Sequence, residues 1–429
     1  MILELKIKNF LSFKEETIFS FEATKDKTFE NYQVVEVAPG TRILRLAILY
    51  GANASGKSNL IKVFDFIQSF WFNKPENKDK STGVTPFLLD KKTPQKTSEF
   101  SLTFYVEGIK YEYYLELDRK NVISEKLFVY SGSHADLIFN RKLNKNVSDI
   151  TFNSKRIKIN KTAKDEITIK CLTNMSVFAA YNQVNVEIEE IENVVKWIKA
   201  HYKLPHIESN TKLLNYAENA ISENQTQKDF ILNFLQQADY NITNINTEII
   251  VRPISDKELA TIINFATNIS DNKKERIKKE KTIKASKTEF EHKIVNKTGK
   301  EEFYKLLKTD QSQGTLRTFG LAGVICETIE SNAFLAIDEI ESSLHPRLVE
   351  FIIEDFLKHK GQSQLLLTTH YDGLLEEDDL LRKDSIWFTN KKENGSTELY
   401  SLADFKGVDR ISSLQKAYKY GKFGATPNI

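Results

Sequence analysis

The chain has few cysteines, no long apolar run and almost no net charge, and the first two deficits each exclude a class of protein. Only two of its 429 residues are cysteines, Cys171 and Cys326, and no histidine or cysteine stands near either at a metal-ligand spacing. The sequence therefore predicts neither a disulfide framework nor a zinc site. We expect both cysteines to be small buried hydrophobic residues.

Long hydrophobic segments are also missing. No apolar run approaches the roughly 18 residues that a membrane span needs, and Lys and Glu interrupt the hydrophobic pattern at the N-terminus. No heptad repeat is sustained, so a long coiled-coil arm is not expected. Hydrophobic residues make up 40% of the chain, enough for a large core in more than one lobe. We expect a soluble, cytoplasmic protein without a membrane partner.

What the chain does have is a phosphate-binding motif. Gly51-Ala-Asn-Ala-Ser-Gly-Lys-Ser58 fits the pattern G-x-x-x-x-G-K-[ST] between an apolar run (43–50) that predicts a buried strand and an amphipathic run (59–70) that predicts a helix. The glycines permit a tight turn whose N–H groups face phosphates. Lys57 can then contact the β- and γ-phosphates, and the Ser58 hydroxyl is the expected Mg²⁺ ligand. The residues predicted to bind ATP here are Gly51, Asn53, Ala54, Ser55, Gly56, Lys57, Ser58 and Asn59.

A second apolar run, 334–337, ends in two carboxylates, Asp338 and Glu339. In a parallel sheet the end of such a strand lies beside the phosphate-binding loop. Asp338 then reaches Mg²⁺ directly or through water, and Glu339 is placed to orient or deprotonate the attacking water. The alternative is an ordinary acidic turn at the end of a strand.

A third buried-strand pattern, Leu365 to Thr369, is followed by His370. Its imidazole would lie on the same edge of the sheet, where it could hydrogen-bond the γ-phosphate or the attacking water and act as a sensor. The alternative is a strand-end histidine that bonds a loop carbonyl. Outside the 338–341 region the carboxylates show no clustered spacing suited to two-metal nuclease chemistry.

Together these segments resemble the ABC/SMC/RecF-type ATPases, and more closely the stand-alone ATPases of bacterial phage-defence operons described as AAA_15/AbiL/RloA-like. The resemblance extends to the opening segment 2–13, to Asn59-Leu60 after the loop, to segment 338–346 and to the terminal segment 418–427, for which the sequence offers no physical account. It implies an α/β fold: an ABC-type P-loop ATPase head with an antiparallel β-subdomain and a helical insertion between Walker A and the signature motif.

The resemblance further implies that Ser312-Gln-Gly314-Thr is the signature motif, which caps the γ-phosphate bound by the opposite protomer. Ser312 and Gly314 open a predicted helix (316–331), and a helix N-terminus presents a hydroxyl and unpaired N–H groups to an anion. A plain helix cap is the alternative. One protomer cannot place this motif on its own P-loop in that architecture, so ATP is expected to join two protomers head to tail.

The chain departs from the family pattern at several positions. The signature lacks the Leu and second Gly of transporters, His345 stands where transporters carry Asp, and Leu11 stands where SMC-like relatives often carry a basic residue. No Q-loop glutamine is obvious. Gln183, just after a strand-like run (177–181), is our candidate for that Mg²⁺ ligand, although Asn182 could equally serve, or neither.

The pattern along the chain predicts three parts. Residues 1–183 form the N-terminal part of the head with an antiparallel meander over 100–130, residues 184–305 form a helical insertion, and residues 306–429 form the C-terminal part of the head. The segment 71–97, rich in Lys, Pro, Thr and Asp, is expected to be an exposed loop.

A formal net charge of +2 conceals one asymmetric segment, 273–287, with eight basic residues against two acidic ones. Such a segment could bind DNA, or an acidic protein that mimics DNA. It could equally be a solvated face or a docking site for a partner subunit.

The sequence therefore predicts an ATPase in which Lys57, Glu339 and His370 act on ATP and Ser312 and Gly314 act in trans. The resemblance implies a sensor or switch of an anti-phage system, of the abortive-infection and PARIS-like kind, that controls a separate effector, commonly a nuclease encoded nearby. Two other classes remain open: a RecF/SMC-like DNA-repair ATPase stimulated by DNA, and a scaffold that ATP stabilises with little turnover. The trigger, the effector and the number of subunits beyond a pair stay undetermined.

Overall fold

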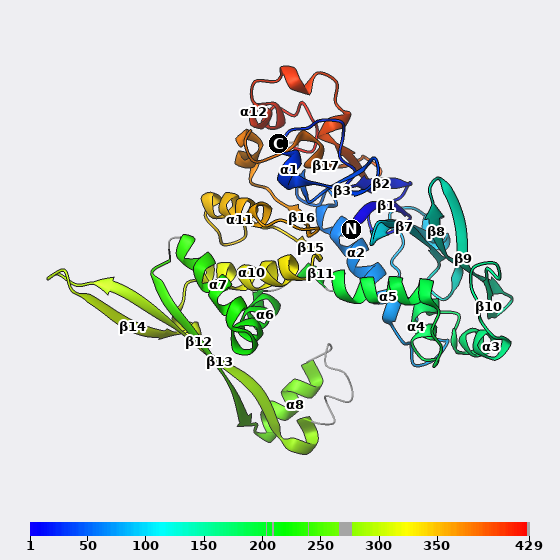
Figure 1. The fold of residues 1–429 in the computed structure, drawn as a ribbon, viewed down its shortest axis with the longest axis horizontal. Helices are drawn as coiled ribbons and strands as arrows, with labels where there is room; N and C mark the ends of the chain where they lie inside the picture. The colour runs from blue at the N-terminus through cyan, green and yellow to red at the C-terminus, as the bar shows by residue number, and fades with distance from the viewer. Residues whose placement is uncertain (203, 208–209, 239, 266–276, 427–429) are drawn as a thin grey trace. The chain divides into compact units, whose positions relative to one another are not determined.

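The chain divides into two compact units. The structure, a computed structural model, describes residues 1–202, 204–207, 210–238, 240–265 and 277–426. The first unit comprises Met1–Glu208 and Thr328–Ile429, and the second comprises Ser209–Glu327. Figure 1 shows the elements of both.

A six-stranded sheet forms the centre of the first unit, in the order β11-β15-β16-β5-β17-β18. The first five strands are parallel, and β18 is antiparallel to β17. Every residue of β5, β15 and β16 is buried, which explains their largely apolar sequences. The predicted buried strands at 334–337 and 365–369 are confirmed, whereas the predicted strand at 43–50 divides between β4 (Thr41–Leu44) and β5. The strands are β5 (Leu46–Gly51), β11 (Leu204–Ile207), β15 (Phe334–Ile337), β16 (Gln364–Thr368), β17 (Ile386–Lys391) and β18 (Thr397–Ser401).

A seven-stranded antiparallel sheet, in the order β10-β9-β8-β7-β6-β1-β2, lies in the same unit. Residues 100–130 fall in three of its consecutive strands, so the predicted meander is confirmed. Its strands are β1 (Ile2–Lys8), β2 (Thr17–Ser20), β6 (Ser98–Val106), β7 (Ile109–Leu117), β8 (Val122–Ser131), β9 (His134–Asn144) and β10 (Val147–Phe152). A small hairpin of β3 (Val34–Ala38) and β4 (Thr41–Leu44) belongs to the same unit.

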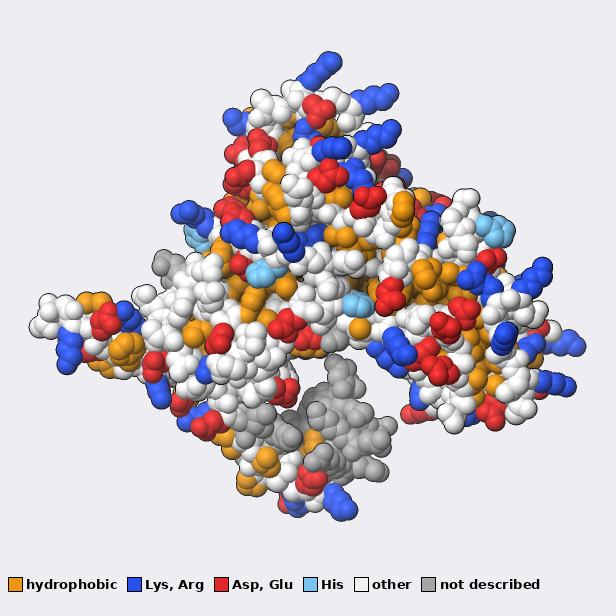
Figure 2. All heavy atoms as spheres, in the orientation of Figure 1, with side chains coloured by type: hydrophobic (Ala, Val, Ile, Leu, Met, Phe, Trp, Pro, Cys, Tyr) orange, Lys and Arg blue, Asp and Glu red, His pale blue; other side chains and the backbone are white. Residues whose placement is uncertain are grey.

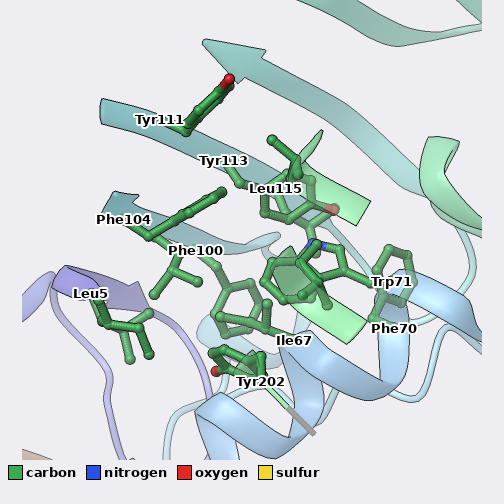
Figure 3. Packing of buried hydrophobic residues seen from close by; sticks show 14 of the residues in the cluster. Leu5, Ile67, Phe70, Trp71, Phe100, Phe104, Tyr111, Tyr113, Leu115 and Tyr202 are labelled. Atoms are coloured by element: carbon green, nitrogen blue, oxygen red, sulfur yellow. The ribbon is translucent and has the colours of Figure 1, made fainter. Parts of the chain in front are cut away.

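Helix α2 (Lys57–Phe72) joins the two sheets through one apolar cluster. Phe64 of α2 lies 4.8 Å from the ring of Phe334 in β15, and Trp71 lies 5.4 Å from the ring of Tyr113 in β7. Figure 3 shows α2 packed against the strands that carry Tyr113 and Phe100. The remaining helices of this unit are α1 (Glu30–Gln33), α3 (Lys161–Lys170), α4 (Val177–Tyr181), α5 (Glu189–His201), α11 (Pro346–Lys358) and α12 (Leu414–Lys419).

A buried amide also connects the sheets. Gln364 of β16 accepts a hydrogen bond from the backbone N–H of Ile2 in β1 at 2.6 Å, and its amide nitrogen donates to the Ile2 carbonyl at 2.8 Å. The same nitrogen donates to the Leu44 carbonyl at 3.2 Å. The glutamine therefore satisfies backbone groups of β1 that would otherwise be buried without a partner.

The second unit contains helices and a three-stranded antiparallel sheet in the order β12-β13-β14. The sequence predicted helices here, and the sheet was missed: β12 and β13 are longer than the usual strand, and β14 is largely exposed, so it carries no alternation of buried and exposed residues. The elements are α6 (Asn210–Glu223), α7 (Gln225–Gln237), β12 (Ile242–Pro253), α8 (Asp256–Phe265), β13 (Thr282–Val295), β14 (Glu301–Leu307) and α10 (Gln313–Glu330), which crosses the division between the units.

The second unit spans 209–327, whereas the sequence led us to expect an insertion over 184–305. At the start of the expected insertion, α5 buries an apolar face in the core of the first unit, where Trp197 stacks 4.5 Å from Phe104. Strand β11 then extends the parallel sheet beside β15. Beyond the end of the expected insertion, the first part of α10 contacts β13 through the rings of Phe319 and Phe290, which lie 5.2 Å apart. Helical periodicity reveals none of these long-range contacts.

Two local predictions were wrong. The strand-like run 177–181 is the helix α4, which Ser176 caps by accepting a hydrogen bond from the Phe178 N–H. The segment 71–97 is not uniformly exposed, since Phe87 is buried and its N–H donates to the side chain of Asn9 at 3.0 Å. Asn9 has a left-handed backbone (φ 55°) and is itself buried. This asparagine fastens the segment to the end of β1.

Cys171 and Cys326 are both buried, as predicted. Residues 273–276 of the predicted basic segment lie outside the described residues. Of the remainder, Lys281 pairs with Asp256 at 2.6 Å and Lys287 pairs with Glu289 at 2.8 Å. On the face in Figure 2, Lys and Arg lie among Asp and Glu. In the part of the chain that the structure describes, no helix is long and apolar enough to cross a membrane.

A buried ion pair in the antiparallel sheet provides a stability test. Glu125 and Arg141 are fully buried with 3.8 Å between carboxylate and guanidinium, and burial raises the pKa of Glu125 above 4.5 while Arg141 opposes the shift. Arg141→Leu should destabilise the protein by about 3–5 kcal/mol at pH 8, because a buried carboxylate loses its cation. The folded-state pKa of Glu125 would rise further, so the deficit should shrink as the pH falls toward the ordinary pKa of glutamate.

Urea unfolding of Arg141→Leu and wild type at pH 5 and pH 8 measures this effect. Lys142→Leu, an exposed neighbour on the same strand, is the matched control and should change the free energy of unfolding little at either pH. An equal deficit at both pH values for Arg141→Leu would contradict the explanation.

Candidate functional site

Three loops meet at one edge of the parallel sheet. Strands β15, β16 and β5 pair in parallel, Leu366 of β16 lying opposite both Ala336 of β15 and Ala47 of β5. The loops after these strands therefore begin side by side. They carry the P-loop, the Asp338–Glu339 pair and His370, which were the separate motifs of the sequence.

The P-loop turns through two left-handed residues, Ala54 (φ 59°) and Gly56 (φ 115°). Such alternation directs successive N–H groups to one side, and the first N–H groups of α2 have no acceptor within the helix. A side chain at Gly56 would place its Cβ 2.2 Å from the Thr397 hydroxyl, and one at Gly51 would place it 2.3 Å from the Thr389 hydroxyl. Packing thus requires glycine at both positions, and backbone conformation requires it at Gly56 as well.

A chain of hydroxyl groups holds the P-loop from outside. The Thr397 hydroxyl lies 2.7 Å from both the Ser55 carbonyl and the Ser12 hydroxyl. Because a carbonyl can only accept, the Thr397 hydrogen goes to Ser55, and Ser12 donates its own hydrogen to Thr397. Asn59 of α2 donates its amide to Ser12 at 2.8 Å. The side chain of Asn59, a predicted phosphate ligand, therefore faces the segment that connects β1 to β2.

Ser55, another predicted ligand, is also turned into the protein. Its hydroxyl lies 2.6 Å from that of Thr389 in β17, and the residue is buried. Its contribution to anion binding is thereby limited to its backbone. Asn53 and Ala54 are exposed.

Lys57 lies across the P-loop, with its ammonium group 2.7 Å from the Gly51 carbonyl and 3.2 Å from the Ala52 carbonyl. It is only 6% exposed. Burial lowers the pKa of Lys57 from 10.5, and the carboxylates of the neighbouring loop act in the opposite direction. These carboxylates, Asp338, Glu341 and Glu339, are thus within electrostatic reach of the ammonium group.

Thr368, at the end of β16, organises the two carboxylates. Its hydroxyl donates to Asp338 at 2.5 Å and accepts from the backbone N–H of Glu339 at 2.8 Å. Glu339 itself has a left-handed backbone (φ 47°), a strained conformation for a residue with a side chain. Such outliers are often found at functional sites, and here a side chain of the neighbouring strand holds the turn in place.

Glu341 connects the same turn to His370. One carboxylate oxygen accepts from the His370 N–H at 2.6 Å, and the other accepts from the Thr369 hydroxyl at 2.8 Å. Partial burial lowers the pKa of His370 from 6.5, and the charge of Lys57 lowers it further. The imidazole is therefore predominantly neutral at pH 7.

The donor groups at this edge fit a magnesium ion. Mg²⁺ prefers oxygen ligands and commonly takes only one or two from the protein beside substrate phosphates. Ser58 offers a hydroxyl at the first turn of α2, and Asp338 offers a carboxylate at the end of β15. In the described ranges of the chain, no three His, Cys, Asp or Glu side chains gather as a metal cluster.

Gln183, the predicted third magnesium ligand, has local partners. Its side-chain amide nitrogen donates to the Ala179 carbonyl at 2.9 Å, one turn earlier in the chain, and its backbone carbonyl accepts from Lys170 at 2.6 Å. Asn182 likewise donates its amide to the Phe178 carbonyl at 2.9 Å. Either side chain would have to leave its present partner to reach a metal ion, so neither role is supported by these contacts.

Ser312 and Gly314, the predicted signature residues, belong to the second unit. The Ser312 hydroxyl accepts from the Thr315 N–H at 3.1 Å, which is the geometry of a helix cap at the start of α10. The Gly314 carbonyl accepts from Thr318 at 3.0 Å. The helix cap was the alternative interpretation of the sequence. It does not exclude the other one, since a capped helix N-terminus still presents N–H groups.

His345, which stands where transporters carry Asp, also caps a helix. Its Nδ1 accepts from the Arg347 N–H at 3.3 Å, at the start of α11. Histidine here supplies the acceptor that an aspartate would supply.

Sequence reasoning missed the side chains that support the site. Thr397, Thr389, Thr368 and Glu341 bind its loops, yet none belongs to a motif that predicts a ligand. A partial signal existed for Glu341, since it follows the Asp338–Glu339 pair by two residues. For the threonines no local signal was present, because their partners lie far away in the sequence.

A family model described as "AAA domain, putative AbiEii toxin, Type IV TA system" matches residues 46–159 and 203–376, more than half of the chain. The matched ranges include the P-loop, Ser312, Asp338, Glu339 and His370. A comparison with curated proteins found no match.

Among solved structures, the chain is similar to three SMC heads. The SMC head domain from Thermotoga maritima is 13% identical with a TM-score of 0.41, over 93% of this chain and 98% of that one. An SmcHead bound to the C-winged helix domain of ScpA is 14% identical with a TM-score of 0.41, over 97% and 99%. A head domain with an extended coiled coil, bound to the C-terminal domain of ScpA derived from Pyrococcus furiosus, is 15% identical with a TM-score of 0.36, over 98% of each chain.

Gly56→Ala should weaken nucleotide binding about 10- to 100-fold, because a strained backbone conformation costs roughly 1–3 kcal/mol and the new methyl group collides with Thr397. Gly83→Ala is the matched control, since Gly83 also has a positive φ (85°) but nothing within 4 Å of the added carbon. Equilibrium titration with a fluorescent ATP analogue measures both. Because Gly83 lies outside the P-loop, Gly83→Ala should leave nucleotide binding unchanged, and equal losses in the two variants would show that the effect is not specific to the P-loop.

Proposed function

The chain belongs to the AAA_21 family of AAA domains, and we propose that it is an ABC-type ATPase that binds and hydrolyses ATP between two head-to-tail protomers. This membership agrees with the resemblance to ABC/SMC/RecF-type ATPases of the abortive-infection kind. The observation that carries the proposal is the meeting of the P-loop, the Asp338–Glu339 pair and His370 at one edge of the parallel sheet.

In this proposal the P-loop backbone binds the phosphates and Lys57 neutralises them. The N–H groups around Gly56 and at the start of α2 would donate to the phosphate oxygens. Lys57 exchanges a bond to its own loop, at Gly51 or Ala52, for one to a phosphate oxygen. The exchange is favoured because a phosphate carries a full negative charge and a carbonyl does not.

Ser58 and Asp338 would hold the magnesium ion, and Thr368 positions Asp338 for this purpose through its hydrogen bond. When bound, the ion neutralises charge on the β- and γ-phosphate oxygens.

Glu339 is proposed to orient or deprotonate the attacking water. Its turn is held from the β16 side by Thr368, so the carboxylate begins at a defined position beside the P-loop. His370 is proposed to sense the γ-phosphate as a neutral imidazole, which Glu341 positions through the backbone N–H. Gln183 remains a proposed metal ligand on the resemblance alone.

The second protomer would contribute Ser312 and Gly314 at the N-terminus of α10. A helix of this length presents free N–H groups and the positive end of its dipole at that point. In the family architecture the motif faces the nucleotide of the partner, so ATP would join two copies of the chain.

We further propose that this ATP-dependent pairing serves as a switch in an anti-phage system that controls a separate effector such as a nuclease. The support is the family description, which refers to a putative AbiEii toxin and a type IV toxin–antitoxin system. Two observations would test this role. The product of a neighbouring gene in the operon should copurify with the ATPase, and the ATPase should release that product during phage infection. If no product copurifies and deletion of the neighbouring genes leaves phage resistance unchanged, the switch role is wrong.

Glu339→Gln should trap the ATP-joined assembly, because ATP is bound but the water is not activated. Its mass, measured by light scattering, should therefore rise by a whole multiple when Mg·ATP is added and stay unchanged with Mg·ADP.

Ser312→Arg in the Glu339→Gln background should block the rise, because a bulky cation replaces the small cap at the proposed trans contact. Ser222→Arg, at an exposed serine of α6 in the same unit, is the matched control and should leave the rise intact. If the mass of Glu339→Gln never responds to ATP, the pairing mechanism fails. A mass that is already a multiple without nucleotide would contradict ATP-driven assembly specifically.

The pH dependence of hydrolysis should reflect His370. Because its pKa is lowered from 6.5, the imidazole takes up a proton only below that value, so the rate should be level from pH 7 upward through the mild alkaline range and fall at lower pH. His370→Gln, which can hydrogen-bond but not titrate, should turn over more slowly and lose this fall. A steady-state phosphate-release assay across that range measures both, and an unchanged acidic limb in His370→Gln would assign the titration to another group.

A further inference from the structure

A cavity of about 440 Å³ lies beside the P-loop in the first unit, and the terminal segment of the chain forms one wall of it. This segment was the part of the sequence without a physical explanation. The cavity is lined by Gly51, Ala52, Asn53, His370, Asp372, Tyr418, Lys419 and Thr426.

Aromatic packing fastens the wall to the strands next to the P-loop. The Tyr418 ring, at the end of α12, stacks on Phe388 of β17 at 5.7 Å and lies 5.8 Å from Tyr50, the residue before Gly51. Phe423 stacks on the same Phe388 at 5.4 Å, and its carbonyl accepts from the Tyr400 hydroxyl at 2.6 Å. These contacts make the terminal segment part of the core around β5 and β17.

Backbone turns return the segment to the cavity after α12 ends. Gly421 (φ 72°), Gly424 (φ 65°) and Ala425 (φ 60°) are all left-handed. The Tyr418 hydroxyl donates to the Ala425 carbonyl at 3.2 Å and closes the turn. The described part of the segment thereby brings Lys419 and Thr426 to the same cavity. Pro427, the last residue of the resemblance, lies outside the described residues.

Lys419 is held in this wall by a carboxylate of the His370 loop. Its ammonium group lies 3.4 Å from Asp372, and the other oxygen of Asp372 accepts from Gln415 at 3.0 Å. The lysine side chain is 53% exposed, so it can extend without disturbing the core. Lys57 donates to the carbonyls of Gly51 and Ala52, and these two residues line the same cavity as Lys419. Lys419 is therefore a second cation at this part of the P-loop.

We propose that Lys419 binds the terminal phosphate of ATP within its own protomer, leaving Asp372 when the triphosphate enters. The inference rests on the proposed function, because Lys57, which reaches the β- and γ-phosphates, marks this cavity as the γ-phosphate end of the site. A terminal phosphate offers more charge to an ammonium group than one carboxylate does. The terminal segment thus distinguishes ATP from ADP and couples the γ-phosphate to α12.

The test compares nucleotides on the full-length chain by equilibrium titration with fluorescent Mg·ADP and a fluorescent, slowly hydrolysed Mg·ATP analogue. Lys419→Ala should lose about tenfold in affinity for the ATP analogue and keep its affinity for ADP. Lys419→Arg should retain most of the preference, because it preserves the charge. Lys416→Ala is the matched control: the same residue type, exposed, three positions earlier on α12 and not part of the cavity wall.

Asp372→Asn provides an independent arm, since it releases Lys419 and removes a negative charge from the cavity. It should bind the ATP analogue more tightly than wild type and bind ADP nearly equally. Competition with inorganic phosphate identifies the source of the anion. Free phosphate is expected to displace neither nucleotide. Displacement of ADP by millimolar phosphate would show a general anion site and overturn the assignment to ATP.

Failure of this inference is distinguishable from failure of the proposed function. If wild type binds neither nucleotide, the ATPase proposal itself is wrong. If wild type prefers the ATP analogue and Lys419→Ala retains the full preference, or loses ADP to the same degree, Lys419 is only a structural element of α12. Circular dichroism of each variant verifies that the fold is preserved. If Lys419→Ala unfolds, the Asp372→Asn result decides the matter, because an unchanged affinity of that variant for the ATP analogue would contradict the proposal.

Discussion

The parallel pairing of β15, β16 and β5 is the constraint on which the site depends. Each of these strands is fully buried, so its register is set by apolar packing on both faces and cannot slip without exposing a row of hydrophobic side chains. That register brings the P-loop, the Asp338–Glu339 pair and His370 to one edge. Helix α2 and Gln364 then join this sheet to the antiparallel one, and Gln364 does so from the start of β16, at the opposite end of that strand from His370.

Around this edge, small polar side chains maintain the geometry that the motifs require. Thr397 and Ser12 hold the outer side of the P-loop, and Thr368 holds the turn of Glu339. Glu341 restrains the backbone of His370. These groups are partly or fully buried, where a hydrogen bond that is lost leaves a desolvated partner and costs about 1–3 kcal/mol. The loops are consequently preorganised by the fold, and the residues proposed to contact ATP need not provide their own support.

The two units contribute differently to the proposed mechanism. The first unit contains a P-loop, carboxylates and a histidine in one place, whereas Ser312 and Gly314 lie at a helix start in the second. A head-to-tail pair would combine them, which is the reason for assigning ATP the role of a bridge. The terminal segment adds a contact of another kind, because α12 packs on the strand beside the P-loop and Lys419 lines the cavity next to that loop. A nucleotide in this site would thus meet groups from both ends of the chain.

The sequence by itself determined the elements whose signals are local: the buried strands, the P-loop with its flanking helix, the antiparallel meander and the cap at Ser312. Such features follow from periodicity, from glycine at left-handed positions and from short capping patterns. Only the tertiary structure decided that α5 and β11 belong to the first unit, that 177–181 is a helix, and that Thr397, Glu341 and Lys419 adjoin the site. Those outcomes depend on contacts between residues distant in the sequence, whose free energy a local pattern does not contain.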